Sequence, residues 1–205
     1  MISLDDAARQ LTGVWKMAFG ADDWRRELDR TEDGVFSSFW AMAFTAPLVA
    51  LFSVISFRAL LKMAAAPDLA VLHLPLSVFI SAKLVSFALE WVACLTFLLV
   101  IARAGGAGRR AADIIVGYNW IQPITVAAQG PAIALIAATG DAGIGGFLVL
   151  PALGLSLALY WAFIRKTMET AVGQTIALIA ALYVIGLSVD AGVTAIAMAL
   201  FAPHP

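Results

Sequence analysis

The sequence predicts an all-α integral membrane protein with five transmembrane helices, preceded by an amphipathic helical segment. The first observation is composition: 62% of the 205 residues are hydrophobic and 13% are charged, whereas an ordinary soluble domain is about half apolar and about a quarter charged. The second is distribution, because the apolar residues fall into five long runs. A helix needs roughly 20 apolar residues to cross the hydrocarbon core of a bilayer, and each run is long enough.

The N-terminal segment, residues 1–33, should be helical and should lie outside the hydrocarbon core. Ser3 and Asp6 have the spacing of a capping box, and apolar residues then recur at helical spacing. Gly20 should end this helix, and a second short helix should follow. Two placements stay open. The segment either lies in the headgroup zone or packs as a soluble helix on the cytoplasmic ends of the spans.

The transmembrane domain covers residues 34–205. Because the first apolar run starts only after a mixed-charge segment, it does not resemble a cleavable signal peptide. The turn at 139–142, Thr-Gly-Asp-Ala, should join the third and fourth spans as an antiparallel hairpin. Prolines mark expected kinks within the spans. The spans are expected at 35–61, 74–102, 111–139, 143–164 and 171–201.

Lysine and arginine indicate the orientation in the membrane. They gather in the N-terminal segment and in the connections after the second and fourth spans, whereas the opposite side has only Arg58 and Lys62. Because cytoplasmic loops carry an excess of these residues, we expect a cytoplasmic N-terminus and a periplasmic C-terminus. The abundance of Ala, Gly and Val favours a bacterial inner (cytoplasmic) membrane. Six large aromatic side chains also fall towards the same inner face, where such rings anchor a protein: Trp15, Trp24, Trp40, Trp120, Tyr160 and Trp161.

Several functional classes receive no support from the sequence. A formal net charge of −1 gives no basic footprint for nucleic acid. Cys94 has no partner for an internal disulfide and is interpreted as a small buried hydrophobe. His73 and His204 are too far apart to favour a metal site. There is no phosphate-binding glycine loop and no nucleophile turn, so we expect neither an enzyme nor a cofactor.

Three ionisable residues lie deep inside the apolar runs: Lys83 and Glu90 in the second span and Asp190 in the fifth. At 1.5 Å per residue, Lys83 and Asp190 lie roughly 13 Å and 16 Å from the outer ends of their spans. A charge at mid-membrane costs about 2.5–3.5 kcal/mol on the lenient insertion scale. We therefore predict that Lys83 and Asp190 pair across the second and fifth spans.

Glu90 lies roughly 24 Å deep, nearer the inner face. Asn119 and Gln122 lie one turn apart on one face of the third span and are expected to reach it. One interpretation is a polar path or a proton-coupled site. The other is a set of interhelical hydrogen bonds that fixes the packing, at about 0.6 kcal/mol per bond on average. The sequence favours the structural interpretation.

The third span also carries a family resemblance. Its segment 117–123, Gly-Tyr-Asn-Trp-Ile-Gln-Pro, resembles the Gly-Tyr…Pro signature of the Yip (Ypt-interacting protein) membrane family. The pair Tyr160–Trp161, followed by Thr175 and Ala177, is similar to that family's connection between the fourth and fifth spans. The resemblance covers about residues 35–200 and implies a non-enzymatic integral membrane protein. Eukaryotic members of the family act in vesicle traffic and engage small GTPases.

Two functions follow as hypotheses. The first is an interaction or accessory protein that docks a protein partner through its cytoplasmic helices, or organises membrane components, with the lipid bilayer as its surroundings. The alternative is a small transporter or channel component with a polar intramembrane path through Lys83, Glu90, Asp190, Asn119 and Gln122.

Overall fold

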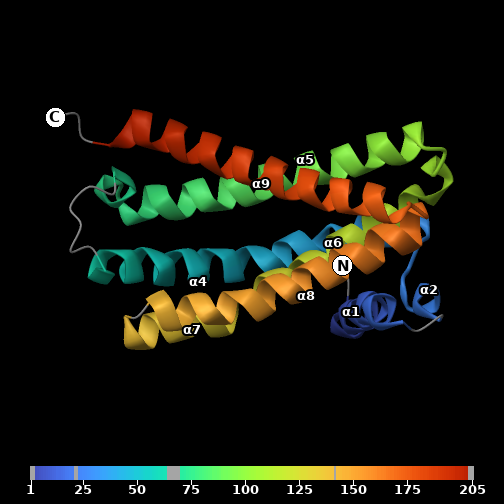
Figure 1. Ribbon diagram of the computed structural model, residues 1–205, viewed down its shortest axis with the longest axis horizontal. Coiled ribbons are helices and arrows are strands. Elements are labelled where there is room, and N and C mark those ends of the chain that lie inside the picture. The colour runs from blue at the N-terminus through green and yellow to red at the C-terminus, as the bar shows by residue number, and fades with distance from the viewer. Residues whose placement is uncertain (1–2, 21–22, 64–69, 141, 203–205) are drawn as a thin grey trace.

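The computed structural model describes residues 3–20, 23–63, 70–140 and 142–202, which form helices and no strand. Five helical passages in these ranges are long and apolar enough to cross a membrane: 32–61, 76–104, 108–139, 146–168 and 172–201. They run side by side along the long axis of the molecule (Figure 1). The protein is therefore a multi-pass, all-α membrane protein, as the sequence predicts.

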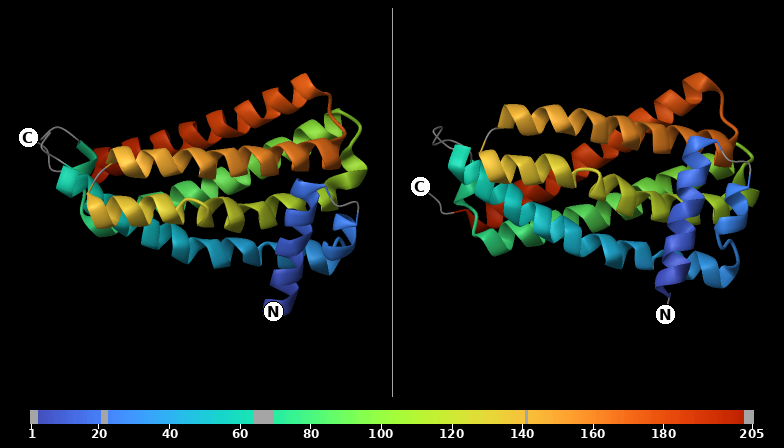
Figure 2. Two further views of the ribbon diagram at one scale, coloured as in Figure 1. Left: turned by 60° about the horizontal axis from the view of Figure 1, so that its bottom comes forward. Right: turned by 90° about the horizontal axis from the view of Figure 1, so that it is seen from below.

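Two short helices lie at one end of this bundle, called here the α1 end. They are α1 (Leu4–Phe19) and α2 (Trp24–Glu27), and α1 lies across the ends of the long helices rather than parallel to them (Figure 2). The connections after the second and fourth passages are at the same end (Figure 1). The turn between the third and fourth passages and the end of the fifth lie at the opposite end.

The first passage consists of α3 (Glu32–Ser38) and α4 (Trp40–Met63), which follow each other at Phe39. Thr31 caps α3, since its hydroxyl accepts the backbone N–H of Gly34 at 3.1 Å. This cap explains why the helix begins at Glu32, three residues before the first strongly apolar position.

The second and fifth passages are the longest continuous helices, α5 (Leu76–Ala104) and α9 (Val172–Phe201). A short 3₁₀ helix, η1 (Ala70–His73), precedes α5 and delays its start by two residues relative to the prediction. These two helices pack against each other more extensively than any other pair of elements. The last helix is thus fastened mainly to the second span.

The third passage is interrupted rather than merely kinked. A 3₁₀ turn, η2 (Gly108–Arg110), leads into α6 (Ala111–Ala127), and α7 (Gly130–Thr139) follows a break. Pro131 has no N–H to donate to the carbonyl one turn earlier, which removes a bond from the helical ladder at this break. Pro123, also expected to mark a kink, stays within α6.

The fourth passage, α8 (Ala142–Met168), folds back beside α7 (Figure 2), which confirms the predicted hairpin. Gly140 ends α7 in the left-handed conformation, with φ of 70°, whereas Asp141 lies outside the described residues. At its other end α8 runs to Met168, four residues beyond the predicted span. There Thr167 donates its hydroxyl to the carbonyl of Phe163 at 2.7 Å.

The N-terminal segment follows the predicted local structure. The hydroxyl of Ser3 accepts the N–H of Asp6 at 3.1 Å and donates to its carboxylate at 2.7 Å, and Gly20 ends α1 with φ of 99°. One face of α1 is buried against α6, α8 and α2, whereas its other side exposes large apolar residues. The helix therefore packs on the spans and also presents an apolar surface, formed by Leu4, Trp15 and Phe19.

The prediction that six large aromatic rings anchor at the inner interface is wrong for three of them. The Tyr160 ring packs near those of Tyr118 and Tyr183 inside the bundle. Trp24 is 3% exposed and Trp120 is 1% exposed, so both belong to the core. Trp24 fills the inner side of α2, and the Trp120 ring lies 6.4 Å from that of Phe44 in α4. Trp15 and Trp40 are about half exposed, as an interfacial ring requires.

Candidate functional site

The predicted ion pair between the second and fifth spans is present. Lys83 Nζ lies 2.7 Å and 2.8 Å from the two carboxylate oxygens of Asp190. Ser86, one turn further along α5, donates its hydroxyl to the same carboxylate at 3.0 Å. Because residues three apart on a helix share a face, α5 offers two donors to a single acceptor on α9.

Both charges lie at membrane depth. Lys83 is seven residues from the start of α5 and Asp190 is eleven from the end of α9, which corresponds to roughly 10 Å and 16 Å along the helix axes. The pair is nevertheless not sealed within protein, since the side chains are 29% and 44% exposed. Both side chains also line a cavity.

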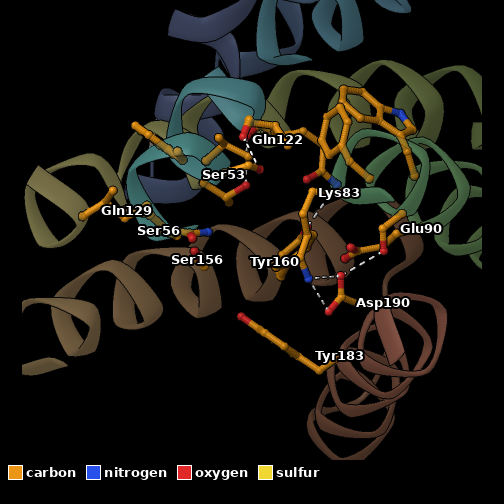
Figure 3. A pocket seen from close by; sticks show the side chains of 18 of the residues that line it. Ser53, Ser56, Lys83, Glu90, Gln122, Gln129, Ser156, Tyr160, Tyr183 and Asp190 are labelled. Atoms are coloured by element: carbon orange, nitrogen blue, oxygen red, sulfur yellow. Dashed lines mark hydrogen bonds and ion pairs between the residues drawn. The ribbon is translucent and has the colours of Figure 1, made fainter. Parts of the chain in front are cut away.

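This cavity, called here the central cavity, has a volume of about 360 Å³ and is lined by residues from all five membrane passages. Figure 3 shows the charged and polar side chains that converge on it. A second cavity of about 250 Å³ adjoins it between α5, α6, α8 and α9 and shares Glu90, Tyr160 and Asp190. The hydrogen-bonding side chains that line the central cavity, other than the indole of Trp91, are Ser53, Ser56, Lys83, Ser86, Glu90, Tyr118, Gln122, Thr125, Gln129, Ser156, Tyr160, Tyr183 and Asp190.

Glu90 lies between the two cavities, at the midpoint of α5. It is fourteen residues from Leu76 and from Ala104, so it is not nearer the inner face, as the predicted span 74–102, which is shifted by two residues, implied. Its carboxyl lies against Gly186 of α9: a Cβ built on that glycine would come 2.6 Å from Glu90 Oε1. Glu90 forms no hydrogen bond or ion pair with any residue that the structure describes, and a side chain at position 186 would displace its carboxyl from this place.

Gln122 shares the central cavity with Glu90 but bonds elsewhere. Its Nε2 donates to the hydroxyl of Tyr160 at 3.1 Å. The Tyr160 ring lies 6.4 Å from that of Tyr118 and 6.5 Å from that of Tyr183. Three tyrosines therefore surround the part of the cavity that faces Glu90.

The prediction that Asn119 reaches Glu90 is wrong. Asn119 is fully buried, accepts from Trp91 Nε1 at 2.8 Å, and donates to the Ser38 hydroxyl at 2.7 Å. Ser38 in turn donates to the carbonyl of Val35 at 2.7 Å. Trp91, the residue after Glu90, takes the position opposite Asn119, so a closed chain of hydrogen bonds ties α5, α6 and α3 together.

The sequence reasoning missed several residues that line the central cavity, among them the serines of α4 and α8. Ser53 and Ser156 donate their hydroxyls to carbonyls one turn earlier, at 2.7 Å and 2.9 Å, which leaves their oxygen lone pairs free to accept. The signal was present, because Ser53 and Ser56 lie one turn apart in an otherwise apolar run. Such a pair puts two hydroxyls on the same helix face.

The arrangement suits the binding of a small polar molecule better than the binding of a metal. Among the described residues, no group of three or more His, Cys, Asp or Glu side chains is placed to hold a metal ion. Cys94 is buried, as predicted, and its thiol faces the carbonyl of Leu182 at 3.7 Å. The cavity instead offers an ion pair, amides, hydroxyls and a carboxyl that is unpaired within the part of the chain that the structure describes.

No protein-family model matches the chain, and neither a curated protein nor a solved structure matches it significantly. The resemblance to the Yip family therefore stays a prediction. In the structure, its segment 117–123 has packing roles of its own. A Cβ on Gly117 would come 3.0 Å from the Phe163 ring, Tyr118 lines the cavity, and Asn119 is part of the buried chain.

Proposed function

We propose that the protein binds a small polar solute inside the membrane, as a small transporter or a component of one. The observation that supports this proposal is the central cavity, in which three ionisable side chains and residues from all five passages meet. Its volume of about 360 Å³ is within the range of small-molecule sites, and corresponds to on the order of ten water molecules. The proposed role is non-catalytic.

Glu90 is the residue that we expect to interact with the solute or to carry a proton. Lys83 and Asp190 already neutralise each other at 2.7 Å, whereas Glu90 has no polar partner among the described residues. A carboxyl in this position inside a membrane is expensive and commonly marks an ion or proton path. The tyrosines and Gln122 beside it offer further hydrogen bonds.

The proposal includes a location and an orientation. We propose a bacterial inner membrane with the N-terminus in the cytoplasm and the C-terminus in the periplasm. The bias of arginine and lysine supports this orientation, because the α1 end carries most of the basic residues and Arg58 lies in the half of α4 towards the opposite end. Basic residues concentrate on the cytoplasmic side of multi-pass proteins.

Thiol labelling tests whether the cavity admits solutes. In a Cys94→Ala chain, Ser56→Cys places a thiol in the cavity, and Val85→Cys places one on the exposed outer side of α5 as the matched control. A membrane-impermeant cationic methanethiosulfonate should modify the cavity thiol in intact vesicles and leave the control unmodified. Equal and negligible modification of both positions from either side would contradict the proposal.

A flux measurement separates transport from a static cavity. Proteoliposomes that contain a pH-sensitive dye should show a proton flux under an imposed membrane potential. Glu90→Gln should lower that flux at least about tenfold, because its amide does not exchange a proton at neutral pH. The Lys83→Asp/Asp190→Lys exchange should retain more of the flux. A Glu90→Gln protein with the full flux would exclude a proton path through this carboxyl.

A second candidate is the accessory role that the Yip resemblance implies. The outer side of α1 favours it, since Leu4, Trp15 and Phe19 are all about half exposed or more and the last two rings are 4.5 Å apart. A protein partner docked there should co-purify in mild detergent with the natural chain, and Trp15→Ala/Phe19→Ala should abolish its recovery.

A further inference from the structure

A separate pocket at the α1 end is surrounded by arginines. It has a volume of about 840 Å³ and lies between α1, α2, the connection to α3, η2 and the first turn of α6. It shares no residue with the central cavity. Six guanidinium groups line it, against the carboxyls of Asp29 and Asp113: Arg9, Arg25, Arg26, Arg30, Arg109 and Arg110.

Four of these arginines already have partners. Arg30 and Arg25 approach the buried carboxylate of Asp113, at 3.3 Å and 3.7 Å. Arg110 bonds to Glu169 at 2.5 Å and to the carbonyl of Thr167 at 3.3 Å. Arg9 pairs with Asp6 at 3.2 Å. These contacts hold the arginines in place around the pocket.

Arg26 and Arg109 are left over. Both are exposed, and neither forms a hydrogen bond or an ion pair with any residue in the described ranges. They come from different elements, α2 and η2, that lie far apart in the sequence. A surplus of guanidinium charge around one concave surface favours a bound anion, and two free planar forks suit a phosphate group in particular.

We propose that this arginine pocket binds a phosphate-bearing anion, with an anionic phospholipid headgroup as the source that the location favours. The pocket ends at Ala112 and Asp113, in the first turn of α6, where the chain enters a membrane passage. Basic pockets at that level are where anionic headgroups bind to membrane proteins. A soluble phosphate compound would bind through the same chemistry, so the test must separate the two sources.

The experiment uses the full-length protein in a neutral detergent and follows its melting temperature. The ligands are dihexanoyl phosphatidylglycerol, dihexanoyl phosphatidylcholine and inorganic phosphate, each titrated below any micelle-forming concentration. Arg26→Gln/Arg109→Gln is the test variant. Arg58→Gln/Arg103→Gln is the matched control, because it removes the same charge from two exposed arginines that do not line the pocket.

Stabilisation by phosphatidylglycerol and not by the zwitterionic lipid, weakened at least about tenfold in the test variant only, supports a lipid headgroup. The same dependence on Arg26 and Arg109 with inorganic phosphate supports a soluble phosphate compound. The proposal is overturned if neither anion stabilises the protein, or if both variants respond like the natural chain. Arg109→Lys keeps the charge but loses the planar guanidinium. Its stabilisation by the anion should lie between that of the natural chain and that of Arg26→Gln/Arg109→Gln.

Discussion

Two polar clusters begin at neighbouring residues of α5, and they differ in kind. Trp91 leads to the closed chain through Asn119 to Ser38, in which each described polar atom has a partner and no charge is present. Glu90 leads to the open cluster, where a carboxyl that has no partner among the described residues faces a cavity beside an ion pair. Both clusters lie within the same five-helix bundle.

The difference shows how polar residues in a membrane protein can be assigned a role. A closed chain occupies all of its donors and acceptors and leaves no space, so its contribution is to packing and specificity. An open cluster leaves acceptors free and keeps a void beside them, which is what a ligand requires. Depth in the membrane does not separate the two cases, because Glu90 and Trp91 lie at nearly the same level.

Lys83→Met should have the largest effect on stability. It leaves the carboxylate of Asp190 at membrane depth with Ser86 as its one remaining donor among the described residues, at a cost of about 2–3 kcal/mol. The melting temperature in detergent should fall clearly, and Lys83→Met/Asp190→Asn should recover most of the loss. A single variant as stable as the natural chain would mean that the pair does not bind α9 to α5.

The next prediction compares an amide-to-leucine substitution in the closed chain with one in the open cluster. Asn119→Leu should destabilise the protein by about 1–3 kcal/mol, because it leaves the buried N–H of Trp91 without an acceptor. Gln122→Leu should cost less than about 1 kcal/mol, since the Tyr160 hydroxyl borders a cavity that can hold water. Equal losses in thermal melts would remove the distinction between a closed and an open cluster.

A smaller effect is expected for Gly186→Ala, in which the new methyl group would displace the Glu90 carboxyl. Gly192→Ala is the control on the same helix, because a Cβ there meets nothing within 4 Å. The free energy of unfolding of the control should rise by a few tenths to about 1 kcal/mol, because alanine has the higher helix propensity. Gly186→Ala should be about 1 kcal/mol less stable than the control. In a Glu90→Ala background this difference should disappear.

The smallest effect is expected for the ion pairs of Lys16, which lie outside the membrane passages. They show how little a solvent-exposed polar cluster contributes compared with the two clusters inside the bundle. Lys16 contacts Asp23 at 3.0 Å and Glu27 at 2.7 Å. Hydrogen bonds to Glu27 and Asp23 raise the pKa of Lys16 above 10.5, and the bond to Lys16 lowers the pKa of Asp23 below 3.8. The stabilisation is thus fully present between about pH 4 and pH 10.

The stabilisation from the Lys16 contacts is lost as the pH falls through the lowered pKa of Asp23, or as it rises through the raised pKa of Lys16. Hydrogen exchange of α1, corrected for the intrinsic rate, should therefore speed up slightly at these extremes and with added salt. Lys16→Met should remove this dependence. If hydrogen exchange of α1 depended more strongly on pH and salt in Lys16→Met than in the natural chain, the prediction would be wrong.

The sequence was sufficient for the features that depend on distance along a helix. The five spans follow from the length of the apolar runs, and the Lys83–Asp190 pair follows from counting residues from the outer ends of two spans. The cap at Ser3 and the helix end at Gly20 are local and need no tertiary information.

The features that depend on rotation around a helix could not be predicted. Asn119 and Gln122 share a face, yet one bonds to Trp91 and the other to Tyr160, because each position meets a different neighbouring helix. The central cavity is a space between five helices, and its walls depend on how the helices cross rather than on any one segment.

The ion pair between α5 and α9 also constrains how the protein is made. Lys83 enters the bilayer well before the ribosome reaches Asp190, 107 residues later in the chain. Until the last helix arrives, the lysine must be stabilised by water, by headgroups or by the insertion machinery. A chain truncated before α9 would keep an unpaired ammonium group at membrane depth.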